Sequence, residues 1–185
     1  VSKQLERSFK KNKMKVMTSS EVLSVDTSGK KCKVQIKTKK GEEAVEVDVV
    51  LSAVGVSTNI EGIGLEETGI KHEKGKIEVD DFYRTNIEGV YAIGDIVHGP
   101  ALAHVASHEG IICVEKISGM DVDPLDYNNI PGCTYTYPEV ASVGMTEKAA
   151  KEAGYEIKVG KFPYSASGKA KASGKTDGFV KVIFD

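Results

Sequence analysis

The chemistry of this sequence centres on one carboxylate, Asp95, which follows a short apolar run. The run Val90-Tyr91-Ala92-Ile93 lies between Gly89 and Gly94 and predicts a short buried strand. A carboxylate at the end of a buried strand is costly unless it accepts hydrogen bonds. Asp95 therefore requires donors, either from its own chain or from a ligand.

A helix is predicted after Asp95, beyond a Gly-Pro turn, from about Ala101 to Ile117. Open α/β sheets bind ligands beyond the carboxyl ends of their strands, and the free N–H groups of a following helix point to the same place. A polyhydroxyl chain that donates to Asp95 and an electron-rich ring at the helix start fit this arrangement. The alternative is a turn in which Asp95 bonds only local amides.

Two glycine-rich stretches look like phosphate-binding loops but lack the required spacing. GIGLEE, which starts at Gly62, has no third glycine and does not follow a strand. GKAKASGKT has five residues between Gly168 and Gly174, where a P-loop needs four. Because it lies between two predicted strands, we expect a basic hairpin loop that does not open a helix.

No metal or nucleophile motif is predicted. His104 and His108 stand four residues apart, a spacing compatible with a metal, but no third ligand accompanies them at matching spacing. No Gly-x-Ser-x-Gly segment supports a serine hydrolase. The cysteines Cys32, Cys113 and Cys133 form no CxxC pair, which favours free thiols in a reducing, cytoplasmic compartment.

The composition argues against nucleic-acid and membrane partners. Lys plus Arg number 25 and Asp plus Glu number 27, so the net charge is −2, and the basic stretches are short. No apolar run reaches the roughly 18 residues that a membrane span needs. The first residues are charged throughout, which is not typical of a signal peptide.

The remaining elements are predicted from periodicity. A helix ends near Lys11, a strand opens at Lys15–Met17, and an alternating meander with one wet face follows. Val49–Val54 is apolar on both faces and predicts a strand covered on both sides. The Pro- and Asp-bearing segment Asp121–Pro131 predicts a linker. The meander strands are predicted over 21–26, 31–37 and 43–48, later strands over 76–79, 133–136, 141–144, 157–162 and 179–184, and a helix over 146–153.

Several motifs together resemble the pyridine-nucleotide disulfide oxidoreductase family. TNIEGVYAIGDIVHGPALAH, from Thr85 to His104, is similar to the second FAD-binding motif of that family. DVVLSAVG, GIGLEETGIK and GKIEVDDFYRTN resemble the strand that closes the NAD domain and the start of the central region. IPGCTYTYPEVASVGMTE and VGKFPYSASGKAKASGKTDGFVKV resemble the opening of the dimer-interface domain. The likeness spans the whole chain and is strongest to the lipoamide-oxidising branch.

The resemblance implies roles for particular residues. The Asp95 carboxylate would accept hydrogen bonds from the ribityl hydroxyls of FAD. Main-chain groups of four residues would contact the pyrimidine edge of the flavin: Ala101, Leu102, Ala103 and His104. Gly55 would let the backbone approach the nicotinamide ribose of NAD, and Val22 would contact NAD through its main chain.

The sequence also departs from the family pattern. Val56 and Thr58 stand where the family commonly has Arg and Pro, and Tyr137 stands where lipoamide enzymes usually carry His. The chain contains no GxGxxG motif, no CxxxxC redox disulfide and no His-Pro acid/base motif. We therefore assign no catalytic residue to this chain, and we expect it to be an internal segment that continues at both ends.

The implied fold is α/β with α+β. It combines partial FAD/NAD(P)-binding, Rossmann-like domains with the start of the dimerisation domain, divided as 1–57 (NAD domain), 58–126 (central, FAD-contacting) and 127–185 (interface). The implied reaction passes electrons from dihydrolipoamide through a cysteine pair and FAD to NAD. The implied partners are a second copy in a homodimer and the lipoyl domains of 2-oxo acid dehydrogenase complexes. Two alternatives stay open: a sister enzyme, such as a mercuric or glutathione reductase, and a non-catalytic flavin- or nucleotide-binding module.

Overall fold

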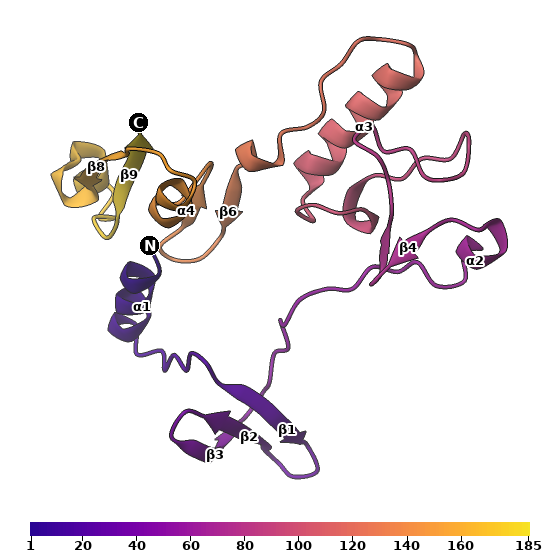
Figure 1. Ribbon diagram of the computed structural model, residues 1–185. Helices are drawn as coiled ribbons and strands as arrows, with labels where there is room; N and C mark the ends of the chain where they lie inside the picture. The colour runs from indigo at the N-terminus through magenta and orange to yellow at the C-terminus, as the bar shows by residue number, and fades with distance from the viewer. The chain divides into compact units, whose positions relative to one another are not determined.

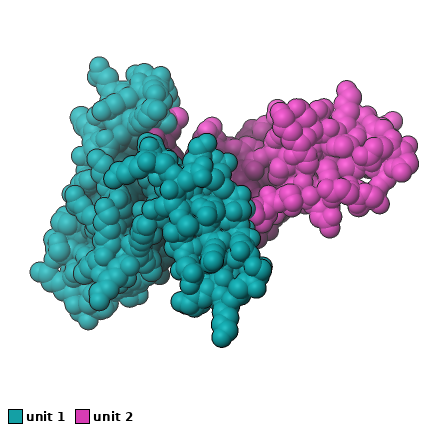
Figure 2. Space-filling view, turned by 90° about the horizontal axis from the view of Figure 1, so that it is seen from below, with its two compact units in different colours: residues 1–54, 133–140, 147–185 teal, residues 55–132, 141–146 magenta.

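A computed structural model describes residues 1–185, and the chain divides into two compact units (Figure 2). The first unit contains Val1–Val54, Cys133–Val140 and Glu147–Asp185, and the second contains Gly55–Gly132 and Ala141–Thr146. No helix has the length and apolar character that crossing a lipid bilayer requires.

The amino-terminal part of the first unit is a helix followed by a three-stranded antiparallel sheet (Figure 1). The helix is α1 (Ser2–Lys11), and the strands are β1 (Glu21–Asp26), β2 (Cys32–Thr38) and β3 (Gly41–Val47). The sheet has the register expected of a meander, and Val34 of β2 pairs with Val45 of β3. The side chain of Val34 is buried. The predicted alternation with one wet face is confirmed for β2.

Two strands predicted near this sheet do not form. Residues 15–17 are irregular, and Val49–Val54 is hydrogen-bonded to no strand. Leu51 and Val54 are 87% and 96% exposed, although their apolar character predicted burial on both faces. The physical reason is that a strand needs a hydrogen-bonded neighbour and a covering layer, and this chain supplies neither to the segment.

The carboxyl-terminal part contains two small sheets and two short helices. β6 (Gly132–Thr134) pairs with β7 (Val140–Ser142), and β8 (Lys158–Pro163) pairs antiparallel with β9 (Phe179–Phe184). Helix α4 (Glu147–Glu152) lies between the two sheets in sequence, and Lys181 of β9 donates to its Glu147. The peptide bond between Tyr137 and Pro138 is cis.

The Gly/Ser/Lys-rich stretch between β8 and β9 is not the plain hairpin loop that was predicted. A turn of 3-10 helix, η3 (Tyr164–Ala166), leads into a short helix, α5 (Gly168–Ala172). The Ser167 hydroxyl caps this helix by accepting from the Ala170 amide. The predicted hairpin is confirmed, because β8 and β9 pair across this stretch. The expectation that the stretch opens no helix was wrong, because a serine cap and a run of alanine and lysine favour one helical turn within a glycine-rich loop.

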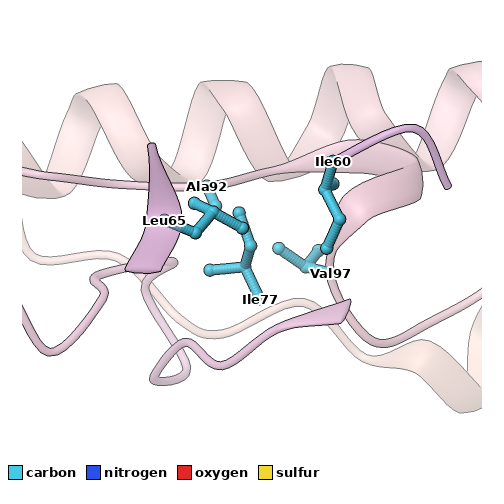
Figure 3. Close-up of a cluster of buried hydrophobic side chains, with 5 residues drawn as sticks. All are labelled: Ile60, Leu65, Ile77, Ala92 and Val97. Carbon is cyan, nitrogen blue, oxygen red and sulfur yellow. The ribbon is translucent and has the colours of Figure 1, made fainter. Parts of the chain in front are cut away.

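The second unit is organised around a small apolar core. Its elements are α2 (Leu65–Thr68), β4 (His72–Glu73), β5 (Lys76–Ile77), η1 (Gly94–Ile96), α3 (Ala103–Ile117) and η2 (Tyr127–Asn129). Five buried side chains point toward one another in Figure 3: Ile60, Leu65, Ile77, Ala92 and Val97. The core therefore joins β5 to the residues on both sides of η1, which fixes the place of Asp95.

The run before Asp95 is extended but is not a regular strand. Tyr91 forms an isolated antiparallel bridge with Arg84, and the Ala92 amide donates to the Tyr83 carbonyl. Ala92 is buried and Ile93 is partly exposed, so the predicted burial holds for only part of the run. The segment predicted as a linker, 121–131, contains the ordered turn η2.

Candidate functional site

Asp95 lies at the centre of η1, with its side chain exposed. Its carboxylate accepts no hydrogen bond from the chain, so the structure does not support the alternative of a turn that Asp95 stabilises through local amides. The main chain of this turn is held instead by the Val97 amide, which donates to Gly94, and by the Lys76 ammonium, which donates to the Asp95 carbonyl. The 3-10 turn η1 directs this carboxylate outward, where a ligand can reach it.

The first backbone amides of α3 have no hydrogen-bond acceptor in the chain. The helix begins at Ala103, two residues later than predicted, and Leu102 is its extended N-cap with no capping side chain. The amides of Val105 and Ala106 donate to the Leu102 carbonyl, whereas the amides of Ala103 and His104 have no acceptor in the chain. This end of the helix therefore presents free N–H groups and the positive end of the helix dipole.

The turn that carries Asp95 packs closely on α3. Gly94 has φ +75°, and a Cβ built on it would lie 3.3 Å from the Cβ of Ala106. A Cβ on Gly110, one turn further along α3, would lie 3.2 Å from Cδ1 of Ile93. Glycine at position 94 thus meets two demands, a left-handed backbone and a close approach to a helix.

A buried glutamate ties the same turn to α3. Glu109 is 1% exposed; its Oε2 accepts from the Gly94 amide at 2.6 Å and its Oε1 from the Tyr127 hydroxyl at 2.6 Å. The hydroxyls of Tyr127 and Tyr83 lie 3.3 Å apart. Burial raises the pKa of the Tyr127 hydroxyl, and its hydrogen bond to Glu109 raises that pKa further, so the hydroxyl keeps the proton that it donates.

Tyr83 is the third member of this hydrogen-bond network and lies in a constrained turn. Its φ is 68°, an uncommon value for a residue other than glycine, and Asp80 Oδ1 supports the turn by accepting from the Phe82 and Arg84 amides. Burial raises the pKa of the Tyr83 hydroxyl, partly offset by its hydrogen bond with Tyr127. The turn therefore places a neutral hydroxyl next to that of Tyr127.

Comparison with known proteins places this arrangement in a family. Residues 1–110 match the sequence profile of the pyridine nucleotide-disulphide oxidoreductases, and residues 130–185 match the profile of their dimerisation domain. The chain belongs to the pyridine nucleotide-disulphide oxidoreductase family. The fold class and the resemblance predicted from the motifs are thereby confirmed.

Individual relatives narrow the comparison. The dihydrolipoyl dehydrogenase of Rhizobium etli is 47% identical over 97% of this chain and 38% of its own length. The dihydrolipoyl dehydrogenase of Zymomonas mobilis is 46% identical over 100% of the chain and 40% of its own length. Among solved structures, LpdA from Mycobacterium tuberculosis superposes with a TM-score of 0.86 at 29% identity, covering 97% of this chain and 39% of that chain. The chain thus spans about two fifths of the relatives that it matches.

The two residues expected to contact NAD in this member of the family lie in different units. Gly55 has φ +125° with open space around its Cβ position, so the backbone there is accessible. Val22 lies on β1, beside an irregularity in the register between Val22 and Ser24, with its side chain exposed. The side chain of Val56 is exposed, and the hydroxyl of Thr58 donates to the Gly75 carbonyl, a bond that proline at position 58 cannot make.

The histidine pair on α3 has no metal-binding geometry around it. The Nε2 of His104 lies 3.1 Å from the Pro131 carbonyl, with which it shares a hydrogen bond. No group of three or more His, Cys, Asp or Glu side chains lies in an arrangement that could hold a metal ion. The cysteines are free, with Cys113 buried, Cys32 partly buried and Cys133 exposed; burial raises the pKa of the Cys113 thiol.

Three side chains that hold the Asp95 turn through hydrogen bonds, Glu109, Tyr127 and Lys76, were not predicted from the sequence. Glu109 had a usable signal, because it stands four residues from both Val105 and Cys113 on the buried stripe of α3. A glutamate in register with an apolar stripe needs buried donors. Tyr127 had no signal, since it lies in a segment of linker-like composition, and Lys76 is one lysine among many on the surface.

Proposed function

We propose that this chain is the part of a dihydrolipoyl dehydrogenase that holds FAD and positions NAD. Relatives of that name at 46–47% identity support the proposal across the length of the chain. One structural observation carries it: the exposed Asp95 carboxylate, free of protein donors, lies in a turn packed against α3, and the first amides of α3 have no acceptor. Acceptor and donors together suit a ligand with hydroxyl groups and an electron-rich ring.

The residues fit FAD as follows. Asp95 would accept from the ribityl hydroxyls. The backbone of Ala101, Leu102, Ala103 and His104 would face the pyrimidine edge of the isoalloxazine ring, where the free amides of α3 donate. When bound, FAD would supply two-electron transfer between a dithiol and a nicotinamide. Because reduction places negative charge near the pyrimidine edge, a helix amino terminus there stabilises the reduced form.

The remaining assignments extend the proposal to NAD and to the assembly. Gly55 and Val22 would contact NAD through their main chains. Residues 1–57 would belong to the NAD domain, 58–126 to the central region and 127–185 to the interface domain. The match of residues 130–185 to a dimerisation domain supports a homodimer. The proposed reaction implies that lipoyl domains of 2-oxo acid dehydrogenase complexes are partners. The free cysteines favour a location in the cytoplasm.

Substitutions at Asp95 test the flavin site in the full-length protein. Asp95→Ala should weaken FAD binding about ten- to a hundredfold, because hydrogen bonds to a charged acceptor contribute roughly 1.5–3 kcal/mol. Asp95→Asn keeps the shape and one acceptor and should weaken it less. Asp123→Asn, a change at an exposed carboxylate without a partner, is the control. Flavin release is followed by fluorescence, and unchanged affinity in Asp95→Ala overturns the site.

The reaction is tested separately from the site. The coding sequence on the two sides of this segment should contain a CxxxxC motif upstream and a His-Pro motif downstream. The full-length protein should reduce NAD with dihydrolipoamide, whereas this 185-residue chain with added FAD should show no turnover, because it contains neither motif. Turnover with glutathione or mercuric ion in place of dihydrolipoamide would assign a sister enzyme instead. An absent CxxxxC would assign a binding module.

A further inference from the structure

We propose that Glu109 is a positioning residue for flavin binding, which holds the Asp95 turn and the start of α3 in one fixed arrangement, and that Tyr127 holds Glu109 in place. The inference rests on the proposed flavin site. It concerns two residues that would not touch the flavin themselves.

The first step is the position of the bond that Glu109 accepts. Its donor is the amide of Gly94, the residue directly before Asp95, at 2.6 Å. Gly94 has a left-handed backbone, so the direction in which the chain continues to Asp95 depends on how the preceding peptide plane is oriented. The hydrogen bond from the Gly94 amide fixes the Ile93–Gly94 peptide plane against α3. Glu109 therefore controls where the Asp95 carboxylate points without contacting it.

The second step is the place of Glu109 on α3. The same helix carries Glu109 in its middle and the free amides of Ala103 and His104 at its start. One rigid element thus supplies the donors for the pyrimidine edge and fixes the turn that supplies the acceptor for the ribityl chain. The separation between these two contact points is set by the Glu109–Gly94 bond.

The third step is the contact of Tyr127 with the turn before α3. Its hydroxyl donates to Glu109 Oε1, and its ring packs over Gly99, where an added Cβ would lie 2.8 Å from Cε1 of Tyr127. Gly99 has φ +130° and lies shortly before the helix start. Tyr127 therefore holds the segment between Asp95 and α3 at its far end, while Glu109 holds it at its near end.

Packing alone does not account for Glu109. The buried stripe of α3 contains Val105 and Cys113, and a leucine would extend it without polar atoms. A buried carboxylate is costly unless donors match both oxygens, and here the two donors come from the turn and from Tyr127. The acceptor pair, and not the volume of the side chain, is what this position supplies.

The test compares variants of the full-length flavoprotein in FAD affinity and in the melting temperature of the apo-protein. Glu109→Leu should weaken FAD binding about tenfold and Glu109→Gln about threefold, because glutamine keeps an acceptor for Gly94. Tyr127→Phe, which retains the ring over Gly99, should weaken it about threefold. Glu115→Gln, a change on the same helix at a carboxylate without a hydrogen-bond donor, is the control. The sharpness of the visible absorption bands of the bound flavin provides a second readout that stability alone does not move.

A double-mutant cycle separates positioning from stability. If Glu109 acts through Asp95, Glu109→Gln should have little further effect on FAD affinity in the Asp95→Ala background. Lower apo-protein melting temperatures with unchanged FAD affinity in Glu109→Gln and Tyr127→Phe would overturn the inference. This outcome is decisive even if Glu109→Leu does not fold, because the two conservative variants provide the measurement. Unchanged affinity in Asp95→Ala overturns the flavin site itself. Weakened binding in Asp95→Ala with wild-type binding in the Glu109 variants overturns only the role of Glu109.

Discussion

The ammonium group of Lys76, on β5, donates a hydrogen bond to the main-chain carbonyl of Asp95. Because Ile77, the next residue, is buried in the core of the second unit, β5 anchors this lysine close to the turn. The turn that carries the candidate flavin contact is therefore held from two sides, by Lys76 at the Asp95 carbonyl and by Glu109 at the Gly94 amide.

Replacing Lys76 should have a small effect on flavin binding. Lys76→Met keeps the length of the side chain and removes the donor, and we expect FAD affinity in the full-length protein to fall about two- to threefold, since exposed hydrogen bonds contribute little. Lys76→Arg should retain most of the affinity, and Lys71→Met is the control at a neighbouring exposed lysine. A tenfold loss in Lys76→Met, or an equal loss in Lys71→Met, would contradict this prediction.

Gly94 and Gly110 should respond differently to the same substitution. Gly94→Ala puts an alanine at φ +75° against the fixed Cβ of Ala106, and we expect a cost of about 1–2 kcal/mol in the free energy of unfolding. Gly110→Ala meets only the flexible end of Ile93 and gains helix propensity, so it should change stability by less than about 0.5 kcal/mol. Urea unfolding of both apo-proteins measures the difference, and equal costs would contradict the argument.

The 185-residue chain by itself should associate in solution. Its segment from Val49 to Val56 exposes apolar side chains that no strand covers, including Leu51 and Val54. Such a segment favours pairing between chains. Size-exclusion chromatography with light scattering should show oligomers or aggregates, and the double variant Leu51→Lys/Val54→Lys should shift the population toward monomer. A monodisperse monomer with a sharp, reversible unfolding transition would contradict this.

The Tyr127 hydroxyl should make stability depend on alkaline pH. Its pKa in the folded protein lies above the ordinary value of 10.0, so the folded state holds this proton more tightly than the unfolded chain does. The resulting stabilisation is complete below the ordinary pKa and is lost as pH rises above it. The free energy of unfolding of the full-length protein should fall more steeply above pH 10.0 than that of Tyr127→Phe. Tyr155→Phe, at an exposed tyrosine, should follow the wild type; parallel curves for Tyr127→Phe would contradict the prediction.

The sequence was informative where a pattern repeats locally. The alternation of Cys32 to Lys37 and the apolar stripe of α3 each predicted an element close to its observed bounds. It was misleading at Val49–Val54, because apolar composition reports what a strand needs and not whether neighbours are present. It also missed α5, where a serine cap and a short alanine- and lysine-containing run form one helical turn inside a glycine-rich loop.

The candidate site was predictable only in part, for a similar reason. Asp95 stands in a motif that fixes its local geometry, so its exposure at a turn beside a helix start follows from nearby residues. The bonds that hold this turn join residues 15 to 19 positions apart, and one of them ends on Tyr127 in a segment with no periodicity. Partners at such separations are selected by packing of the whole unit, which a local pattern does not encode.

The separations along the chain also order events during protein synthesis. The Gly94 amide leaves the ribosome first, Glu109 follows 15 residues later, and Tyr127 follows 18 residues after that. Until Tyr127 emerges, the Glu109 carboxylate has only one of its two donors, and the turn before α3 lacks the ring that packs over Gly99. A nascent chain stalled before Tyr127 therefore carries a turn that lacks both the hydroxyl donor to Glu109 and the ring over Gly99.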